Sequence, residues 1–272
     1  MPILPQLGAD CALFLDFDGT LTELAATPDD VRVPRDLVCD LAALRSSLGG
    51  SVAIVTGRSL ADLDRHLHPL RLPASGVHGA EFRDVDGAVS RIVAADMGPA
   101  QTLIEALCDA DARLRLELKP GALALHYRAA PEREADCIAT MRQALALMPE
   151  STLLRGKMVI ELKPVGVDKG SAVRALLAMA PFRDRRPWFV GDDVTDEAAF
   201  LAVAAAGGVT VKVGAGATGA RHRLPDPTAV RHWLHEAAHA LTQPRPRANS
   251  GCVRAAPAPG CPAGPPLHRA RP

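Results

Sequence analysis

The sequence lacks several features that mark particular classes of protein. Basic and acidic residues each number 31 among 272, so the formal net charge is zero. A chain without a basic excess gives no sign of a nucleic-acid-binding surface, and we expect no nucleic-acid partner. The sequence also has no apolar run of the roughly 18 residues that a membrane helix needs. We therefore expect no membrane partner.

Two further absences concern cysteine and the N-terminus. The six cysteines are scattered and include no CxxC pair. This spacing argues against a zinc site and favours reduced thiols. The N-terminus has no charged region followed by a long apolar segment, so no signal peptide is indicated. We expect a cytoplasmic protein, and we expect it to be a monomer.

Short apolar runs alternate with amphipathic helical patterns along most of the chain. This alternation predicts an α/β fold, with a Rossmann-like parallel sheet covered by helices on both faces. Ligands of such sheets bind at the carboxyl ends of the strands. The expected strands are residues 12–17, 52–56, 188–190 and 209–213, and the expected helices are residues 35–48, 60–67, 169–179, 196–205 and 228–241.

The middle of the chain has a different pattern. Three hairpin signals alternate with two helical patterns, at about residues 99–114 and 131–148. This order predicts an α+β cap domain over residues 82–163, inserted into a core formed by residues 1–81 and 164–242. The last segment, 243–272, is rich in proline, alanine and arginine. It cannot bury enough apolar surface to offset its ordering entropy, so we predict a disordered tail.

The most informative stretch is the DxDGT sequence at residues 16–20, which follows the apolar run 12–15. Side chains two apart on a strand leave on the same side, so Asp16 and Asp18 would project together. Gly19 allows a sharp turn. Paired acids at this position suit a hard metal ion and a nucleophile. The alternative is an ordinary Asp-Gly turn after a strand.

Three more signals follow the DxDGT stretch. Thr56 and Gly57 end an apolar strand just before a helix, where a hydroxyl and backbone amides can hold phosphate oxygens. Lys169 opens a helix, and because the helix dipole opposes a cation there, it needs a nearby anion. The segment 191–197 is dense with carboxylates after a third buried strand. A bound cation would relieve their repulsion, although acids also cap helices.

These four signals, in this order, resemble the four motifs of the haloacid dehalogenase superfamily of phosphohydrolases. The chain is more closely similar to the trehalose-6-phosphate phosphatases, in the bacterial form, from about Leu13 to Trp233. The residues that carry this similarity are GVHGAE at 76–81, ExK at 117–119, ALHYR at 124–128, GKxxxExKP at 156–164 and GDDxTDE at 191–197.

The resemblance implies a mechanism. Asp16 would attack phosphorus to form an aspartyl-phosphate, and Asp18 would act as general acid and then general base. Thr56 and Lys169 would neutralise charge on the phosphoryl group. The resemblance also implies Mg²⁺ as cofactor. Its ligands would be Asp16, the Asp18 carbonyl and Asp192, with Asp193 and Asp196 next to the ligands.

The resemblance further implies that the cap recognises a small-molecule sugar phosphate, trehalose 6-phosphate. The expected substrate contacts are Arg58, His78, Glu117, Lys119, Arg128, Lys157 and Glu161. For Arg58, a position at the site rim or in a structural ion pair is the other interpretation. For the cap residues, the alternative is cross-strand salt bridging on a solvated sheet face. His126 and Tyr127 are interpreted as packing residues.

Two other functions remain open from the sequence. One is a phosphatase of the same superfamily that acts on another sugar phosphate, such as sucrose phosphate or mannosyl phosphoglycerate. The other is a catalytically silent regulatory module. The intact acids and lysine argue against a silent module, and the cap residues argue against another sugar phosphate.

Overall fold

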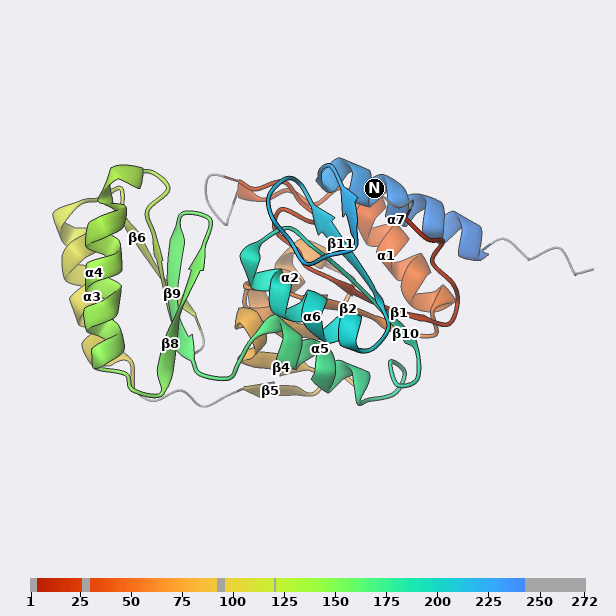
Figure 1. The fold of residues 1–272 in the computed structure, drawn as a ribbon, viewed down its shortest axis with the longest axis horizontal. Coiled ribbons are helices and arrows are strands. Elements are labelled where there is room, and N and C mark those ends of the chain that lie inside the picture. The colour runs from red at the N-terminus through yellow and green to blue at the C-terminus, as the bar shows by residue number, and fades with distance from the viewer. Residues whose placement is uncertain (1–3, 26–29, 92–95, 120, 243–272) are drawn as a thin grey trace, which may run out of the picture.

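The computed structural model describes residues 4–25, 30–91, 96–119 and 121–242. The predicted disordered tail, 243–272, lies outside the described residues. The chain forms two bodies side by side (Figure 1), each built on its own sheet. Among the described residues, no helix combines the length and the apolar character that a membrane span requires.

The larger body is built on an eight-stranded sheet in the order β12-β11-β10-β1-β2-β3-β4-β5. The strands from β12 to β3 are parallel, and β4 and β5 add to the edge in antiparallel fashion. The strands are β1 (Cys11–Leu15), β2 (Val52–Val55), β3 (Ala74–Gly76), β4 (Glu81–Arg83), β5 (Val89–Arg91), β10 (Arg186–Gly191), β11 (Val209–Val213) and β12 (His222–Leu224).

Helices cover both faces of this sheet, as the apolar runs predicted. Because side chains alternate along β1, Leu13 and Leu15 pack toward one helical layer while Ala12 and Phe14 pack toward the other. The first layer contains α1 (Arg35–Ser47), α2 (Leu60–Leu67) and α7 (Pro227–Thr242), and the second contains α5 (Lys169–Leu177) and α6 (Glu197–Ala205). The predicted α/β class is therefore confirmed.

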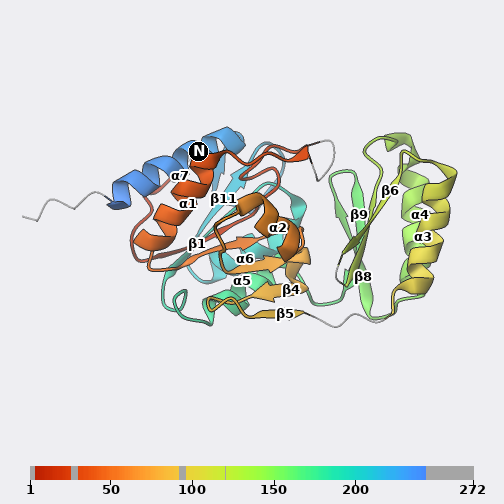
Figure 2. The same cartoon turned by 180° about the vertical axis from the view of Figure 1, so that it is seen from behind.

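The smaller body is a four-stranded antiparallel sheet in the order β6-β7-β9-β8, backed by two helices. Its elements are α3 (Gly98–Ala110), β6 (Arg115–Lys119), β7 (Ala122–His126), α4 (Glu134–Ala146), β8 (Ser151–Gly156) and β9 (Val159–Pro164). Leu123 and Leu125 of β7 pack against the helices, with Ile160 and Leu162 of β9. The opposite face of the sheet looks toward the larger body, as Figure 2 shows from behind.

The first predicted hairpin differs from our expectation, because it belongs to the core sheet and not to the cap. Strand β4 pairs with β3, with Ser75 opposite Phe82. Arg83 is buried and makes two 2.7 Å bonds to the Asp64 carboxylate of α2. These contacts hold the hairpin on the core. We propose that the inserted cap begins after β5 and ends with β9.

Candidate active site

The acids of the DxDGT stretch lie at the carboxyl edge of the large sheet. Asp16 directly follows β1, which lies between β10 and β2, so residues that follow these three strands come together. Thr56 follows β2, and Asp192 follows β10. All three side chains are buried, and all three line one cavity of about 560 Å³ between the two bodies.

Lys169 is the cation at the centre of this edge. Its Nζ lies 2.6 Å from Asp16 Oδ1 and 2.7 Å from Asp196 Oδ1, and all three side chains are buried. The helix α5 that begins with Lys169 is capped by Asp168, whose side chain accepts the N–H of Ser171. The anions expected near a lysine at a helix N-terminus are therefore the carboxylates of Asp16 and Asp196.

Burial and charge set the protonation of this cluster. Burial raises the pKa of the Asp16 carboxyl well above its ordinary value, while the Lys169 charge pulls it back down. Burial alone would lower the pKa of the Lys169 amine, but the Asp16 and Asp196 carboxylates raise it above its ordinary value. The lysine is therefore held as a cation, and its charge favours ionised acids around it.

The same acids fit a hard divalent cation. Asp16, Asp192 and Asp196 each offer a carboxylate oxygen, and these oxygens lie within 4.8 Å of one another. Oxygen donors of this kind suit Mg²⁺. Gly19 has φ +76°, and a Cβ there would come 2.3 Å from an Asp192 oxygen, so glycine lets the turn approach that acid.

The acids expected beside the metal ligands are fixed by hydrogen bonds. Asp196, which we expected next to the metal ligands, is itself one of the three acids whose oxygens lie within 4.8 Å of one another. Its Oδ1 accepts from Lys169 and its Oδ2 accepts the Asp193 N–H at 2.9 Å. The Asp193 carboxylate caps the turn by accepting the Val194 N–H at 2.7 Å. Lys212, which the sequence did not single out, donates to the Asp192 carbonyl.

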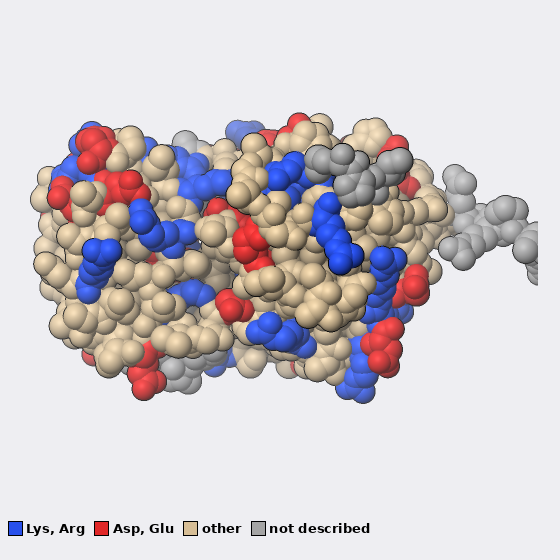
Figure 3. All heavy atoms as spheres, in the orientation of Figure 1, with Lys and Arg blue, Asp and Glu red and all other residues tan. Residues whose placement is uncertain are grey.

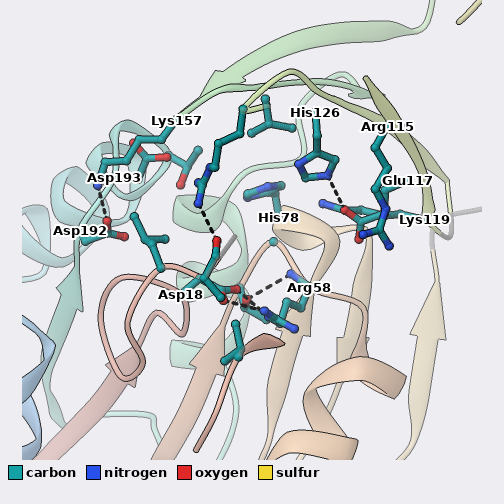
Figure 4. Close-up of a pocket in the computed structure, with 18 of the residues that line it drawn as sticks. Asp18, Arg58, His78, Arg115, Glu117, Lys119, His126, Lys157, Asp192 and Asp193 are labelled. Carbon is teal, nitrogen blue, oxygen red and sulfur yellow. Dashed lines mark hydrogen bonds and ion pairs between the residues drawn. The ribbon is translucent and has the colours of Figure 1, made fainter. Parts of the chain in front are cut away.

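Asp18 faces the cavity and is held from behind by an arginine. Arg58 Nε lies 2.7 Å from Asp18 Oδ2, and Arg58 Nη2 lies 2.7 Å from Asp18 Oδ1. We expected Arg58 at the substrate, at the site rim or in a structural ion pair. In the structure it pairs with Asp18 and also lines the cavity. Its side chain is 7% exposed, against 32% for Asp18. Figure 4 shows the pair at the base of the site.

The cap presents Glu117 and Lys119 to the same cavity, and Glu161 lies buried next to Lys119. Glu117 of β6, Ala124 of β7 and Glu161 of β9 are opposite one another in register, so their side chains share one face of the sheet. Lys119 Nζ lies 2.9 Å from Glu161 Oε2. His78, from the short helix Val77–Gly79 of the core, lies 3.2 Å from the same oxygen.

Two atoms of this cluster are buried without a hydrogen-bond partner in the part of the chain that the structure describes. They are His78 Nδ1 and Glu161 Oε1. Burial favours the neutral form of Glu161, yet Lys119 and His78 keep the pKa of its carboxyl well below the ordinary value. A buried polar atom left without a partner costs about 1–3 kcal/mol.

The remaining predicted cap residues connect the two bodies. Lys157 Nζ lies 2.5 Å from Asp192 Oδ2, and burial of Asp192 raises the pKa of its carboxyl while Lys157 lowers it. Arg128 Nη1 donates to the Ala25 carbonyl of the core at 2.6 Å. On the face shown in Figure 3, charged side chains of both signs lie along the boundary between the bodies.

Three cavity residues differ from the sequence prediction. His126, interpreted as a packing residue, lines the cavity, and its Nε2 lies 2.7 Å from Glu117 Oε2. Arg115 and Arg113 also line the cavity and were missed. Arg115 lies two residues before Glu117 on β6, so the period of two was the signal that could have found it.

The comparisons with known proteins agree with this geometry. A family model described as trehalose-phosphatase matches residues 14–226. A trehalose-6-phosphate phosphatase of Escherichia coli is 41% identical over 251 residues, which cover 89% of this chain and 91% of that protein. The C-terminal domain of the trehalose-6-phosphate phosphatase of C. albicans has a TM-score of 0.75 at 22% identity, covering 84% of this chain and 92% of that one.

A third relative shows the wider fold group. A phosphatase of the Haloalkanoate (HAD) Enzyme Superfamily from Bacteroides thetaiotaomicron has a TM-score of 0.58 at 16% identity, covering 88% of this chain and 98% of that one. At that identity the likeness concerns the fold, and it supports the predicted sheet and cap. The family match spans most of the chain and includes the acids, Lys169 and the cap cluster. This chain is a phosphatase and belongs to the trehalose-phosphatase family.

Proposed function

We propose that this protein hydrolyses trehalose 6-phosphate to trehalose and phosphate in an Mg²⁺-dependent reaction. The observation that carries the proposal is a single cavity lined on one side by the core and on the other by the cap. One side holds Asp16 and Lys169, which suit phosphoryl transfer. The other holds Glu117 and Lys119 of the cap, and the Lys119 amine is paired with the buried Glu161 carboxylate. A disaccharide phosphate carries groups that match both sides.

The chemistry begins at Asp16. One carboxylate oxygen attacks phosphorus, the bond from phosphorus to the sugar oxygen breaks, and its electron pair stays on that oxygen. Asp18 gives this oxygen a proton, which leaves free sugar and an aspartyl-phosphate. Water then attacks phosphorus while Asp18 takes a proton from it. The bond from phosphorus to the Asp16 oxygen breaks, inorganic phosphate leaves, and the Asp16 carboxylate is regenerated. Asp18 suits both roles because it faces the cavity beside Asp16.

Thr56 and Lys169 stabilise the charge that develops on the phosphoryl group. Lys169 is a buried cation in contact with the nucleophile, at 2.6 Å. Thr56 is buried at the end of β2, and its Oγ1 accepts the Arg58 N–H at 3.1 Å, which leaves its hydroxyl proton for a phosphate oxygen. Donors that are already in place are worth more in a buried site than in water.

Asp16, Asp192 and the Asp18 carbonyl would hold Mg²⁺, with Asp193 and Asp196 fixing the ligands around them. When bound, the ion would supply positive charge that polarises the phosphoryl group. The support for this assignment is the grouping of acid oxygens within 4.8 Å of one another. We expect chelation to stop turnover, and we expect Mg²⁺ to raise the melting temperature because it binds the folded state.

The cap would select the sugar. Glu117, Lys119 and Glu161 present charged donors and acceptors on one sheet face, and vicinal hydroxyl groups can bond to both. Lys157 and Arg128 reach from the cap toward the core edge, where the phosphate would lie. His78 contributes from the core side.

The experiment is a measurement of phosphate release from trehalose 6-phosphate, sucrose 6-phosphate and glucose 6-phosphate, with Mg²⁺ and with excess chelator. We expect trehalose 6-phosphate to have the highest kcat/KM. A higher value for sucrose 6-phosphate would show that the site serves another sugar phosphate. The absence of turnover with every ester would show a silent module.

A further inference from the structure

We propose that Arg58 is a positioning residue for Asp18, holding its carboxyl so that one oxygen faces the leaving-group oxygen of the substrate. This inference rests on the proposed function, because it concerns the proton that Asp18 transfers. It also changes the role first expected for Arg58, which was contact with the sugar.

Arg58 and Asp18 form a bidentate ion pair. Arg58 donates from Nε and Nη2 to the two oxygens of Asp18, each at 2.7 Å. A planar guanidinium that contacts both oxygens fixes the plane of the carboxyl as well as its distance. Each oxygen keeps a second lone-pair direction. Both partners line the cavity, but the Asp18 side chain is 32% exposed and the Arg58 side chain only 7%. Asp18 is thus held from one side and available from the other.

Arg58 is itself held by side chains of α2. Its Nη1 lies 2.5 Å from Asp62 Oδ2 and 2.9 Å from His66 Nε2, and both partners belong to α2. Burial, and then the Arg58 charge, lower the pKa of His66, which suits Nε2 as the acceptor. The guanidinium also lies over the Phe17 ring, with Cζ 5.3 Å from the centroid. Each of its three nitrogens is thus engaged by a protein carboxylate.

The role follows from the proton balance. Asp18 enters this step as the carboxylic acid. When the phosphorus–oxygen bond breaks, the electron pair goes to the sugar oxygen, and Asp18 gives that oxygen its proton. The carboxylate that results stays on Arg58, oriented to take a proton from water in the next step. A proton donor that is free to rotate would spend less time facing the oxygen. A leaving group that is stable as an anion needs little help from the donor.

The test is therefore a series of phosphate esters with graded leaving groups. We would measure kcat/KM for p-nitrophenyl phosphate, phenyl phosphate and trehalose 6-phosphate with wild type, Arg58→Met and Arg58→Lys. This ratio reports steps up to the first irreversible one, so hydrolysis of the aspartyl-phosphate does not enter. The two aryl esters have nearly the same size, so their difference reflects the leaving group and not the cap.

General acid catalysis contributes about 10²–10⁴-fold. We expect Arg58→Met to lose about 10²-fold for phenyl phosphate and trehalose 6-phosphate, the low end of that range, since Asp18 itself remains. For p-nitrophenyl phosphate we expect a loss below about threefold. Arg58→Lys keeps the positive charge but cannot form the bidentate contact. It should therefore lose kcat/KM for phenyl phosphate and trehalose 6-phosphate in the same selective way, but by a smaller factor.

Two controls separate positioning from general damage. Arg65→Met removes an arginine of α2 whose side chain is 69% exposed and pairs with Asp62. It should leave the leaving-group dependence unchanged. In an Asp18→Asn background, Arg58→Met should cost almost nothing further, because residues that act as one unit are not additive.

The outcomes are distinct. Equal loss for all three esters would overturn the inference and make Arg58 a support of the fold or the shared chemistry. Loss confined to trehalose 6-phosphate would overturn it in favour of a sugar contact. If Arg58→Met does not fold, Arg58→Lys decides, and failure of both to fold would mark Arg58 as structural. If wild type hydrolyses none of the esters, the proposed function itself has failed.

Discussion

Replacement of Lys169 by methionine tests whether one buried cation holds the acid cluster together. Methionine has a similar length and no charge. In the folded protein it would leave Asp16 and Asp196, which now lie 2.6 and 2.7 Å from the lysine, without that partner. The three buried acids would then face one another within 4.8 Å.

The expected cost follows from the burial of this group. Removing one partner of a buried ion pair costs about 3–5 kcal/mol, because the remaining charge stays desolvated. For domains of this size, 1 kcal/mol corresponds to a shift of about 2–4 °C in Tm. We therefore expect Tm to fall by about 6–20 °C in chelator. Mg²⁺ should recover part of this loss, because it supplies positive charge to the same oxygens.

The loss should depend on pH in a definite direction. Burial holds the pKa of folded Asp16 above its unfolded value. The folded state therefore binds more protons, and this group lowers stability progressively as pH rises from the unfolded pKa through the folded pKa. The Lys169 charge lowers the pKa of Asp16, so removing it should raise that pKa further. The pH range over which ionisation of Asp16 lowers stability then extends to higher pH. The Tm deficit of the variant should be smaller at pH 5 than at pH 8.

Thermal melting of Lys169→Met and Lys157→Met, each with chelator and with Mg²⁺, is the assay. Lys157 is the matched control because it also pairs with an acid of the cluster, Asp192, but its side chain is 50% exposed. Because solvent screens the half-exposed lysine, we expect its loss to cost less than the loss of Lys169, although Asp192 itself is buried. If Lys169→Met melts no lower than Lys157→Met, or if its deficit does not change with pH, the reasoning about buried charge is refuted.

Three further predictions concern turnover. Asp16→Asn should lower kcat by at least about a thousandfold with an unchanged far-UV spectrum, and activity within tenfold of wild type would exclude it as the nucleophile. Glu161→Gln should lower kcat/KM for trehalose 6-phosphate about ten- to a hundredfold and change that for phenyl phosphate little; equal losses would remove the sugar-recognition role. Gly57→Ala should lower kcat/KM for the sugar substrate, because its Cβ would come 2.6 Å from the His78 ring and displace it; unchanged kinetics would show that turnover does not depend on the position of this ring.

The sequence by itself determined the features that depend on neighbours along the chain. The apolar run before Asp16 has the character of a strand buried on both faces, and β1 is such a strand. The acids, the hydroxyl of Thr56 and Lys169 each stand just after a strand or at the start of a helix. Because parallel strands end at one edge of a sheet, this placement was enough to predict that they meet.

The local pattern was insufficient where a contact depended on the tertiary arrangement. The hairpin at Asp86-Gly87 was visible in the sequence, but its place on the core was decided by the pairing of β4 with β3 and by the bond from Arg83 to Asp64. A turn signal fixes the two strands that it joins and says nothing about the sheet that they extend. The hairpin was therefore assigned to the wrong body.

The partners within the site were likewise decided by the fold. Asp18 and Arg58 are 40 residues apart, Lys119 and Glu161 are 42 apart, and Asp16 and Lys169 are 153 apart. Sequence spacing constrains side chains along one strand or helix, but a charge-assisted bond forms only where the packed chain brings donor and acceptor within about 3 Å. The residue types predicted the chemistry, and the packing of the sheets and α2 decided which carboxylate each cation holds.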